Sequence, residues 1–343
     1  MRILMVAPRG GAFTYILKGY ENAFRHLGHD VAYWRGDRAA FRDYRPDAYI
    51  GRTGWRQDIP HDLVAGFGTR VAIHVNPFGT ERLDTVHGNR TLNEPPDLID
   101  WTAAQRPDLV YGLGWGDDAD RYWDRWRTEL GLNVAMIPTA GDPFEFYRVP
   151  ADPKWRCDLA FVGGRWRYKA NHIDSYLMPL MGRYDIRVHG WGGWATWRDP
   201  RSFFRSTKIS DDDVRVLFSS ARIGPVVHEP HTGIYGIDVP ERVFKVPLCG
   251  LLAISDPSAS LHRYFPPDIL PMADTPRHYR DLIDHYLADE DARVDLAARQ
   301  RAHVLAHHTY LNRAQSFLSG LGLADAAAAA GDVIASFQPL DRV

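Results

Sequence analysis

Short apolar runs that alternate with helix-like stretches limit the fold of this chain more than any other feature of its sequence. Residues 3–7, 30–34 and 70–75 are examples, and loops or stretches of helical character separate such runs. Strands separated by helices indicate βαβ units, a parallel sheet and helices on both of its faces. The strands expected in this half lie at 3–7, 30–34, 47–51, 70–75, 109–113 and 133–137.

The same alternation starts again after a proline-rich segment at 138–155, which has little periodicity and is typical of a linker between domains. At 343 residues the chain is long enough for two domains. The sequence therefore predicts an α/β fold of two doubly wound, Rossmann-like parallel-sheet domains that face each other across a cleft. The expected bounds are 1–145 and 146–322, with a tail helix at 323–343. The strands expected in the second half lie at 158–163, 185–190, 223–228, 251–254 and 269–272.

The composition is that of a soluble globular protein, with 45% hydrophobic and 24% charged residues. The net charge of −2 gives no overall field that steers the chain toward nucleic acid or a membrane. Cys157 and Cys249 lie beside apolar runs without metal-type spacing, which favours buried thiols in a reducing compartment. Because we find neither a signal peptide nor a run of about 18 to 20 apolar residues, we expect a cytoplasmic protein.

Ligands of doubly wound sheets bind beyond the carboxyl ends of the strands, so the loops after strands hold the candidate site residues. Gly10 and Gly11 follow the first strand, where they either let a ligand approach the backbone or make a tight turn. The dinucleotide fingerprint G-x-G-x-x-G is absent. His74 ends the fourth strand and is either a general base or hydroxyl-orienting group, or a hydrogen-bonded histidine at the core edge.

Two glycines and two cations follow the first strand of the second half. Gly163 and Gly164 allow a ligand to approach the backbone, and Arg165 and Lys169 carry the positive charge that offsets a diphosphate. The alternative is a solvated turn before an ordinary helix. We therefore treat this loop as a candidate diphosphate site.

His228 and Glu229 follow another strand of the same half. Close-set His and Glu suggest a metal, but neither H-E-x-x-H nor a third ligand in register is present. A polar loop that lines a sugar or a phosphate is the simpler interpretation. We expect no metal.

A short helix expected at 240–248 runs through Gly250 directly into an apolar strand. Pro240 suits its first turn, and Gly250 suits the left-handed position past its end. Unpaired N–H groups and a partial positive charge make such a helix start a natural seat for a phosphate, with Glu241 and Arg242 beside it.

The run at 189–208 interleaves aromatic and cationic side chains and includes Trp191 and Trp194. Such a run suits stacking of a base, a sugar subsite, binding of single-stranded nucleic acid, or a packed cap between domains. We favour a loop on the substrate side, with nucleic acid as the alternative, because the protein as a whole is not basic.

Three motifs together resemble a known family. They are D-L-A-F-V-G-G at 158–164, D-V-P-E-R-V-F-K at 238–245 with C-G and S-D at 249–250 and 255–256, and H-T-Y-L-N-R-A at 308–314. The chain resembles the GT-B glycosyltransferases, in the branch similar to spore-maturation-type proteins with a glycosyltransferase group 1-like C-terminal domain. The N-terminal half resembles that family only in its layout.

The resemblance implies transfer of a sugar, a hexose or pentose, from a nucleoside diphosphate sugar, with the donor held mainly by the C-terminal domain. It implies no catalytic metal and no cofactor other than the donor as co-substrate. Gly163 and Gly164 would approach the diphosphate, Arg242 would lie in the donor pocket, and His74 would face the acceptor or the transferred sugar. His74 would deprotonate the acceptor if the enzyme inverts, or orient the sugar if it retains.

Lys245 departs from the family pattern, which commonly has a ribose-binding glutamate there. Lysine only donates hydrogen bonds, so either Glu241 one turn earlier takes over, or the donor differs, or turnover is lost. The hypotheses are therefore a glycosyltransferase with a small-molecule or glycan acceptor, a non-catalytic nucleotide- or sugar-binding protein, and a glycosyltransferase that acts on nucleic acid.

Overall fold

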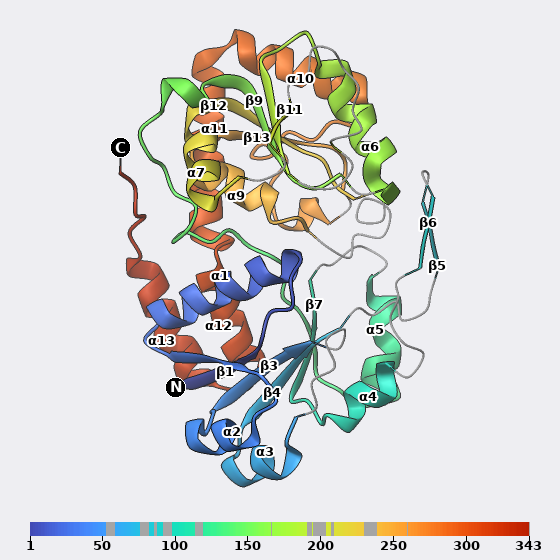
Figure 1. Cartoon of the computed structure of the whole chain (residues 1–343), viewed down its shortest axis with the longest axis vertical. Helices are drawn as coiled ribbons and strands as arrows, with labels where there is room; N and C mark the ends of the chain where they lie inside the picture. Colours follow the sequence, from blue (N-terminus) through green and yellow to red (C-terminus); the bar gives the residue numbers. More distant parts are fainter. Residues whose placement is uncertain are drawn as a thin grey trace. The chain divides into compact units, whose positions relative to one another are not determined.

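The protein was analysed as a computed structural model. It describes residues 1–52, 59–75, 82–85, 88–91, 98–113, 119–165, 167–190, 194, 204–206, 209–229, 239–258 and 260–342. The chain forms two compact units (Figure 1). The first unit contains residues 1–83, 91–140 and 310–337, and the second contains 84–90, 141–309 and 338–343.

The first unit is built on a six-stranded sheet whose strands are all parallel, in the order β2-β1-β3-β4-β7-β8. The chain goes from β1 to β2 on one side and then to β3 on the other, which is the doubly wound arrangement expected from the sequence. The strands are β1 (Arg2–Val6), β2 (Asp30–Trp34), β3 (Ala48–Arg52), β4 (Arg70–His74), β7 (Leu109–Gly112) and β8 (Val134–Met136).

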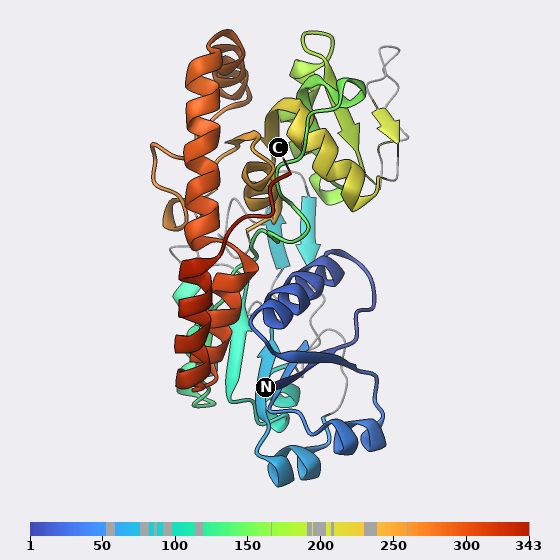
Figure 2. The same ribbon diagram turned by 90° about the vertical axis from the view of Figure 1, so that its left-hand side faces the viewer.

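The helices of the first unit come from both ends of the chain. They are α1 (Ala12–His26), α2 (Arg38–Tyr44), α3 (His61–Phe67), α4 (Leu98–Ala104), α5 (Ala119–Thr128), α12 (Tyr310–Gly320) and α13 (Ala324–Ser336). Figure 2 shows α12 and α13, in red, side by side. A separate two-stranded sheet pairs β5 (Arg82–Thr85) with β6 (Gly88–Thr91).

Residues 310–322 belong to the first unit, whereas we expected them at the end of a C-terminal domain. Aromatic packing explains the difference. The ring of Tyr20 in α1 lies 5.2 Å from that of Phe317 and 5.0 Å from that of Tyr310. Gly19 leaves room for this contact, because a Cβ there would lie 2.2 Å from the Tyr310 ring. The Arg313 guanidinium also donates to the carbonyl of Pro138, at 3.2 Å.

The second unit has a five-stranded parallel sheet in the order β11-β10-β9-β12-β13. The short edge strand β11 was not expected. The strand expected at 269–272 is reduced to a single bridge between Ser255 and Met272. The strands are β9 (Cys157–Val162), β10 (Ile186–His189), β11 (Phe204–Ser206), β12 (Ala221–Val226) and β13 (Leu252–Ser255).

Helices lie between most of the strands of the second unit and after the last of them. They are α6 (Arg167–Leu177), α7 (Asp211–Ser220), α9 (Arg242–Leu248), α10 (Pro276–Ala288) and α11 (Glu290–His307). Short 3₁₀ turns lie at Pro153–Trp155, Met178–Leu180 and Leu261–Arg263. In the parts of the chain that are described, no helix is both long and apolar enough to span a bilayer.

Candidate functional site

The carboxyl ends of three neighbouring strands in the second unit bring together a set of buried polar groups. Gly163 follows β9, His228 lies two residues after β12, and Asp256 follows β13. Because β12 pairs with both β9 and β13 in a parallel sheet, these residues share one edge. That edge is where ligands of doubly wound sheets bind.

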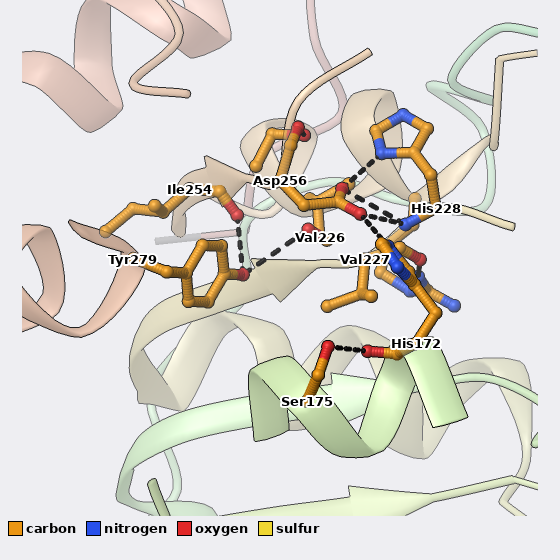
Figure 3. A network of polar contacts seen from close by, with 10 residues as sticks. His172, Ser175, Val226, Val227, His228, Ile254, Asp256 and Tyr279 are labelled. Carbon is orange, nitrogen blue, oxygen red and sulfur yellow. Dashed lines mark hydrogen bonds and ion pairs between the residues drawn. The ribbon is translucent and has the colours of Figure 1, made fainter. Parts of the chain in front are cut away.

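Asp256 is the centre of the network in Figure 3. Its carboxylate is fully buried. It accepts hydrogen bonds from the backbone N–H of His228, at 3.0 and 3.1 Å, and from Nδ1 of the His228 imidazole ring. His172, from α6, contacts it through Nε2 at 2.7 Å. Because an ionised carboxylate only accepts, both rings present an N–H to it.

The charge of Asp256 is fixed by these partners. Burial raises the pKa of its carboxyl, but the charge of His228 and the hydrogen bonds from His172 and His228 together lower it to about 2. Asp256 is therefore ionised at neutral pH and holds both imidazole rings in place.

His228 has one ring nitrogen left over for a ligand. The side chain is buried, and in Figure 3 its second nitrogen points away from Asp256. Within the described part of the chain, this Nε2 has no hydrogen-bond partner. A buried polar atom without a partner is costly, so a hydroxyl or phosphate oxygen placed there would restore a hydrogen bond.

Tyr279 of α10 ties the ends of β12 and β13 together beneath this network. Its hydroxyl lies 2.9 Å from the carbonyl of Ile254 and 3.3 Å from that of Val226 (Figure 3). Burial raises the pKa of the phenol well above its usual value, so it stays protonated and donates. The tyrosine thus fixes the strand ends that carry His228 and Asp256.

Arg242 places a buried positive charge at the same edge. Its Nε donates to the carbonyl of Val162 at 3.0 Å and its Nη1 to that of Val227 at 3.2 Å. The guanidinium also lies 4.2 Å from the centre of the Phe161 ring. Burial lowers the pKa of Arg242 to about 10, so the side chain remains charged at neutral pH.

Gly163 is required by this arginine. A Cβ at that position would lie 2.1 Å from Nη2 of Arg242. The sequence suggested that Gly163 lets a ligand approach, and the structure shows that it lets the guanidinium approach. Gly164, which follows it, is buried.

The other two cations expected here have carboxylate partners. The Arg165 guanidinium makes two hydrogen bonds with Asp174, at 2.5 and 2.8 Å, so its charge is already compensated. Lys169 is buried, and its Nζ lies 3.3 Å from the carboxylate of Glu229. Of the two, Lys169 has the longer ion pair.

The start of α9 differs from the expected phosphate seat. The helix begins at Arg242 rather than at Pro240 and has seven residues. Two of its first N–H groups are occupied: that of Val243 donates to the carbonyl of Pro240 and that of Phe244 to the carbonyl of Glu241. The phosphate seat expected at this helix start stays a prediction, and Gly250 adopts the expected left-handed conformation with φ of 80°.

Glu241 and Lys245 form an ion pair one helical turn apart. Oε2 of Glu241 lies 2.8 Å from Nζ of Lys245, and both side chains are largely buried. The lysine Nζ also lies 4.8 Å from the centre of the Phe146 ring. These contacts hold both groups on one face of α9, as their spacing predicted.

His74 ends β4 in the first unit and is buried there. Its ring lies 5.0 Å from that of Phe13 and 5.3 Å from that of Tyr111. Burial, together with the positive charge of Arg52, holds the pKa of His74 well below its usual value. The imidazole is therefore neutral at pH 7, the form that accepts a proton.

Gly10 and Gly11 are explained by backbone conformation. Their φ angles are 102° and 73°, in the region that favours glycine. A Cβ at either position would meet no heavy atom within 4 Å. Of the two interpretations that the sequence left open, the tight turn is the one this geometry supports directly.

Trp194 is a core residue, not an exposed platform for a substrate. It is buried against Phe161, with ring centres 5.8 Å apart, and its indole N–H donates to the carbonyl of Gly163 at 2.8 Å. A large apolar ring whose single N–H is satisfied inside the protein has no polar group left for an acceptor. Trp191 lies outside the described residues.

Sequence reasoning did not assign His172 or Asp256 to the site. A polar residue directly after the apolar run 251–254 is a usable signal for Asp256, because the carboxyl ends of strands carry site residues. No local pattern marks His172. In the described residues, no group of three His, Cys, Asp or Glu side chains is arranged to hold a metal ion.

The comparisons with known proteins agree with this architecture. Residues 174–319 match the family model described as glycosyl transferase-like. Sucrose-phosphate synthase from Thermosynechococcus elongatus superposes with a TM-score of 0.62 at 14% identity, over 95% of this chain and 100% of that chain. The fold is GT-B.

Two further GT-B structures carry a donor or its product. Anabaena HepE in complex with UDP and glucose has a TM-score of 0.62 at 10% identity, over 94% of this chain and 100% of that one. T4 phage BGT, in complex with UDP-glucose, has a TM-score of 0.57 at 11% identity, over 94% and 99%. No curated protein sequence matches this GT-B chain.

Proposed function

We propose that this GT-B protein transfers a sugar from a nucleoside diphosphate sugar to an acceptor hydroxyl, and that the second unit binds the donor. The glycosyl transferase-like match at 174–319 and the UDP and UDP-glucose complexes of HepE and T4 phage BGT support this proposal. The observation that carries it is the buried edge where Arg242 and His228 lie beside the loop at Gly163.

This edge suits a leaving diphosphate. Transfer breaks the bond between the anomeric carbon and the diphosphate oxygen, so negative charge grows on that oxygen as the acceptor oxygen bonds to the carbon. Preorganised cations and hydrogen-bond donors stabilise such charge best where water is excluded. We assign Arg242 and Lys169 to the electrostatic field at the diphosphate, and Nε2 of His228 to an oxygen of the donor.

The acceptor loses its proton during transfer. The neutral His74 is our candidate for the group that takes this proton in an inverting reaction, or that orients the sugar in a retaining one. The proposal includes turnover without a metal, because Arg242 and Lys169 supply the positive charge that a divalent ion supplies in other transferases. The branch of spore-maturation-type proteins stays a prediction from the motifs.

Because position 245 is a lysine, this proposal assigns binding of the donor's ribose to Glu241. The carboxylate of Glu241 pairs with Lys245, and because a carboxylate accepts several hydrogen bonds, Glu241 is our candidate for the group that accepts from the ribose hydroxyls. Glu241 would then perform the task of the glutamate that the family commonly has at the lysine position.

The test is release of a nucleoside diphosphate. The purified chain is incubated with UDP-, GDP-, ADP- and TDP-sugars, with acceptor mixtures of neutral sugars, sugar phosphates and oligonucleotides, and with or without EDTA. We expect release with one donor, unaffected by EDTA. Binding of a donor without release under any condition would contradict catalysis and support a non-catalytic binding protein. Release that depends on an oligonucleotide would support the nucleic acid alternative.

A further inference from the structure

The second unit holds a cavity of about 390 Å³ at the amino ends of β12 and β13. Ala221 and Leu252, the first residues of these strands, line it together with one face of α11. The network around Asp256 lies past the other ends of the same strands. Because a strand rises about 3.3 Å per residue, the length of β12 alone puts roughly 16 Å between the two places. A ligand in this cavity is therefore distinct from a donor at the carboxyl edge.

Four arginines line this cavity and form two pairs of like charge. Burial lowers the pKa of Arg293, and the nearby charge of Arg222 lowers it further. Burial also lowers the pKa of Arg301, and the nearby charge of Arg148 acts in the same direction. Since α11 rises about 1.5 Å per residue, Arg293 and Arg301 lie about 12 Å apart along it. The two pairs therefore lie at different ends of the cavity.

The end formed by Arg222 and Arg293 has a carboxylate for each cation. Arg222 lies 3.2 Å from the carboxylate of Asp158, and Arg293 lies 3.2 Å from that of Glu290. Each guanidinium also donates to a main-chain carbonyl. The positive charge at this end is therefore compensated within the protein.

The end formed by Arg148 and Arg301 has one carboxylate for two cations in the described part of the chain. Nη2 of Arg301 lies 2.7 Å from Oδ1 of Asp341, which also accepts the backbone N–H of Arg148 at 3.1 Å. The guanidinium of Arg148 itself has no hydrogen bond or ion pair with the described residues. Its side chain lies against Gly250, where an added Cβ would be 3.0 Å from Nε of Arg148. This end thus binds one carboxylate from the chain's own tail and has a second cation available for another anion.

The remainder of the lining is apolar. Leu252 and Ala297 line the cavity and are buried. Ala298 and Ala302 have side chains too short to fill it, and Val294 is 56% exposed beside them. A concave surface with a cation at one end and apolar side chains along it suits a small molecule with a non-polar body and an anionic group.

We propose that this cavity binds a small molecule whose anionic group, a phosphate or a carboxylate, contacts the guanidinium of Arg148 and whose short apolar body lies against α11. A cavity of this volume fits a compact ligand. The proposal does not rest on sugar transfer, because none of these residues belongs to the edge where the donor is proposed to bind.

Calorimetric titration of the whole protein with inorganic phosphate, and separately with acetate, at constant ionic strength tests this site. Butyl phosphate and butyrate carry the same anionic groups on an apolar body. The variants are Arg148→Gln and Asp341→Asn. Arg277→Gln is the matched control, because Arg277 is an exposed residue of α10 that does not line the cavity. Thermal unfolding of each variant checks that the fold is retained.

We expect phosphate or acetate to bind the wild type, and the better of the two identifies the anionic group. Loss of one charge-assisted contact weakens binding about tenfold, so Arg148→Gln should do so and Arg277→Gln should not. Asp341→Asn removes the carboxylate that competes for Arg301, so binding should tighten at least about threefold. A gain of affinity cannot come from a damaged fold. The butyl compounds should bind more tightly than phosphate and acetate.

Three results would overturn the proposal. The first is that neither anion binds. The second is equal binding in Arg148→Gln and Arg277→Gln, which is also the result expected if the anion binds only at the carboxyl edge of the sheet. The third is butyl compounds that bind no better than phosphate and acetate, because the apolar lining would then contact no ligand. Sugar transfer by the protein, or its absence, changes none of these outcomes.

Discussion

The buried carboxylate of Asp256 determines which nitrogen of the His228 ring faces the interior of the network. It faces Nδ1 of the ring and also accepts the backbone N–H of the same residue. The other nitrogen, Nε2, is therefore the one that meets a ligand. This pair gives the second unit a preoriented polar atom at the edge where the donor is proposed to bind.

Replacement of Asp256 by Asn should destabilise the protein. An amide cannot accept from both His228 and His172 as the carboxylate does, and removal of one partner from a buried ionic contact costs about 3 kcal/mol. Urea denaturation measures the change. Asp158→Asn is the control, because the 3.2 Å ion pair of Asp158 with Arg222 is about one-third exposed and is expected to cost less than about 1 kcal/mol. Equal effects of the two changes would contradict the assigned role.

The free energy of unfolding should depend on pH through the carboxyl group of Asp256. The pKa of Asp256 falls from its ordinary value of 3.8 to about 2 in the folded protein. A lowered carboxyl pKa stabilises the fold above about pH 4, and this contribution is lost as pH falls through about 2. The difference in free energy of unfolding between wild type and Asp256→Asn should shrink by about 2 kcal/mol from pH 5 to pH 2. A constant difference over that range would show that Asp256 does not ionise as described.

Gly163→Ala should weaken donor binding. The new methyl group would displace the guanidinium of Arg242 from the carbonyls of Val162 and Val227 and leave a buried charge without its partners. We expect the Kd for the nucleoside diphosphate to rise at least about tenfold. Gly66→Ala is the control. Gly66 lies in α3 with no atom within 4 Å of an added Cβ, so that change should leave binding intact and stabilise the helix by up to about 1 kcal/mol.

His74→Ala should lower kcat about 100-fold or more if the imidazole takes the acceptor proton. The pKa of His74 lies below its usual value, so it is unprotonated over a wider range than an exposed histidine, and kcat should stay level from pH 8 to below pH 6.5. His61→Ala, at the start of α3, is the control. A pH profile with a midpoint near 6.5, or an unchanged kcat in His74→Ala, would exclude this role.

Lys245→Glu should reduce donor binding rather than create activity. It would place a second carboxylate beside Glu241 and remove the cation near Phe146. Lys245→Met retains the apolar stem and removes only the charge, so it separates repulsion from loss of the ion pair. Calorimetry with the donor nucleotide measures both variants. A gain of turnover in Lys245→Glu would instead show that the natural chain is a degenerate member of the fold.

The layered α/β architecture was predictable from the sequence because buried strands and helices have different apolar periods. The positions of β9, β12 and β13 followed from apolar runs, and so did the polar loops after them. The contact between Arg242 and Gly163 was not predictable, because these two residues lie 79 positions apart in the sequence. The prediction that Trp194 lies on the substrate side was wrong for a similar reason. A Trp among arginines is typical of a binding loop, and the hydrogen bond from its N–H to the carbonyl of Gly163 is not visible in the local sequence.

The return of α12 and α13 to the first unit has a consequence for synthesis of the chain. The strands of that unit emerge first from the ribosome, yet Tyr20 lacks Phe317 and Tyr310 until nearly the whole chain has been made. The part that is translated first is thus completed last, after residues 141–309 have had time to fold. A chain that stops at residue 309 is expected to expose its N-terminal half to proteases while the remainder resists digestion.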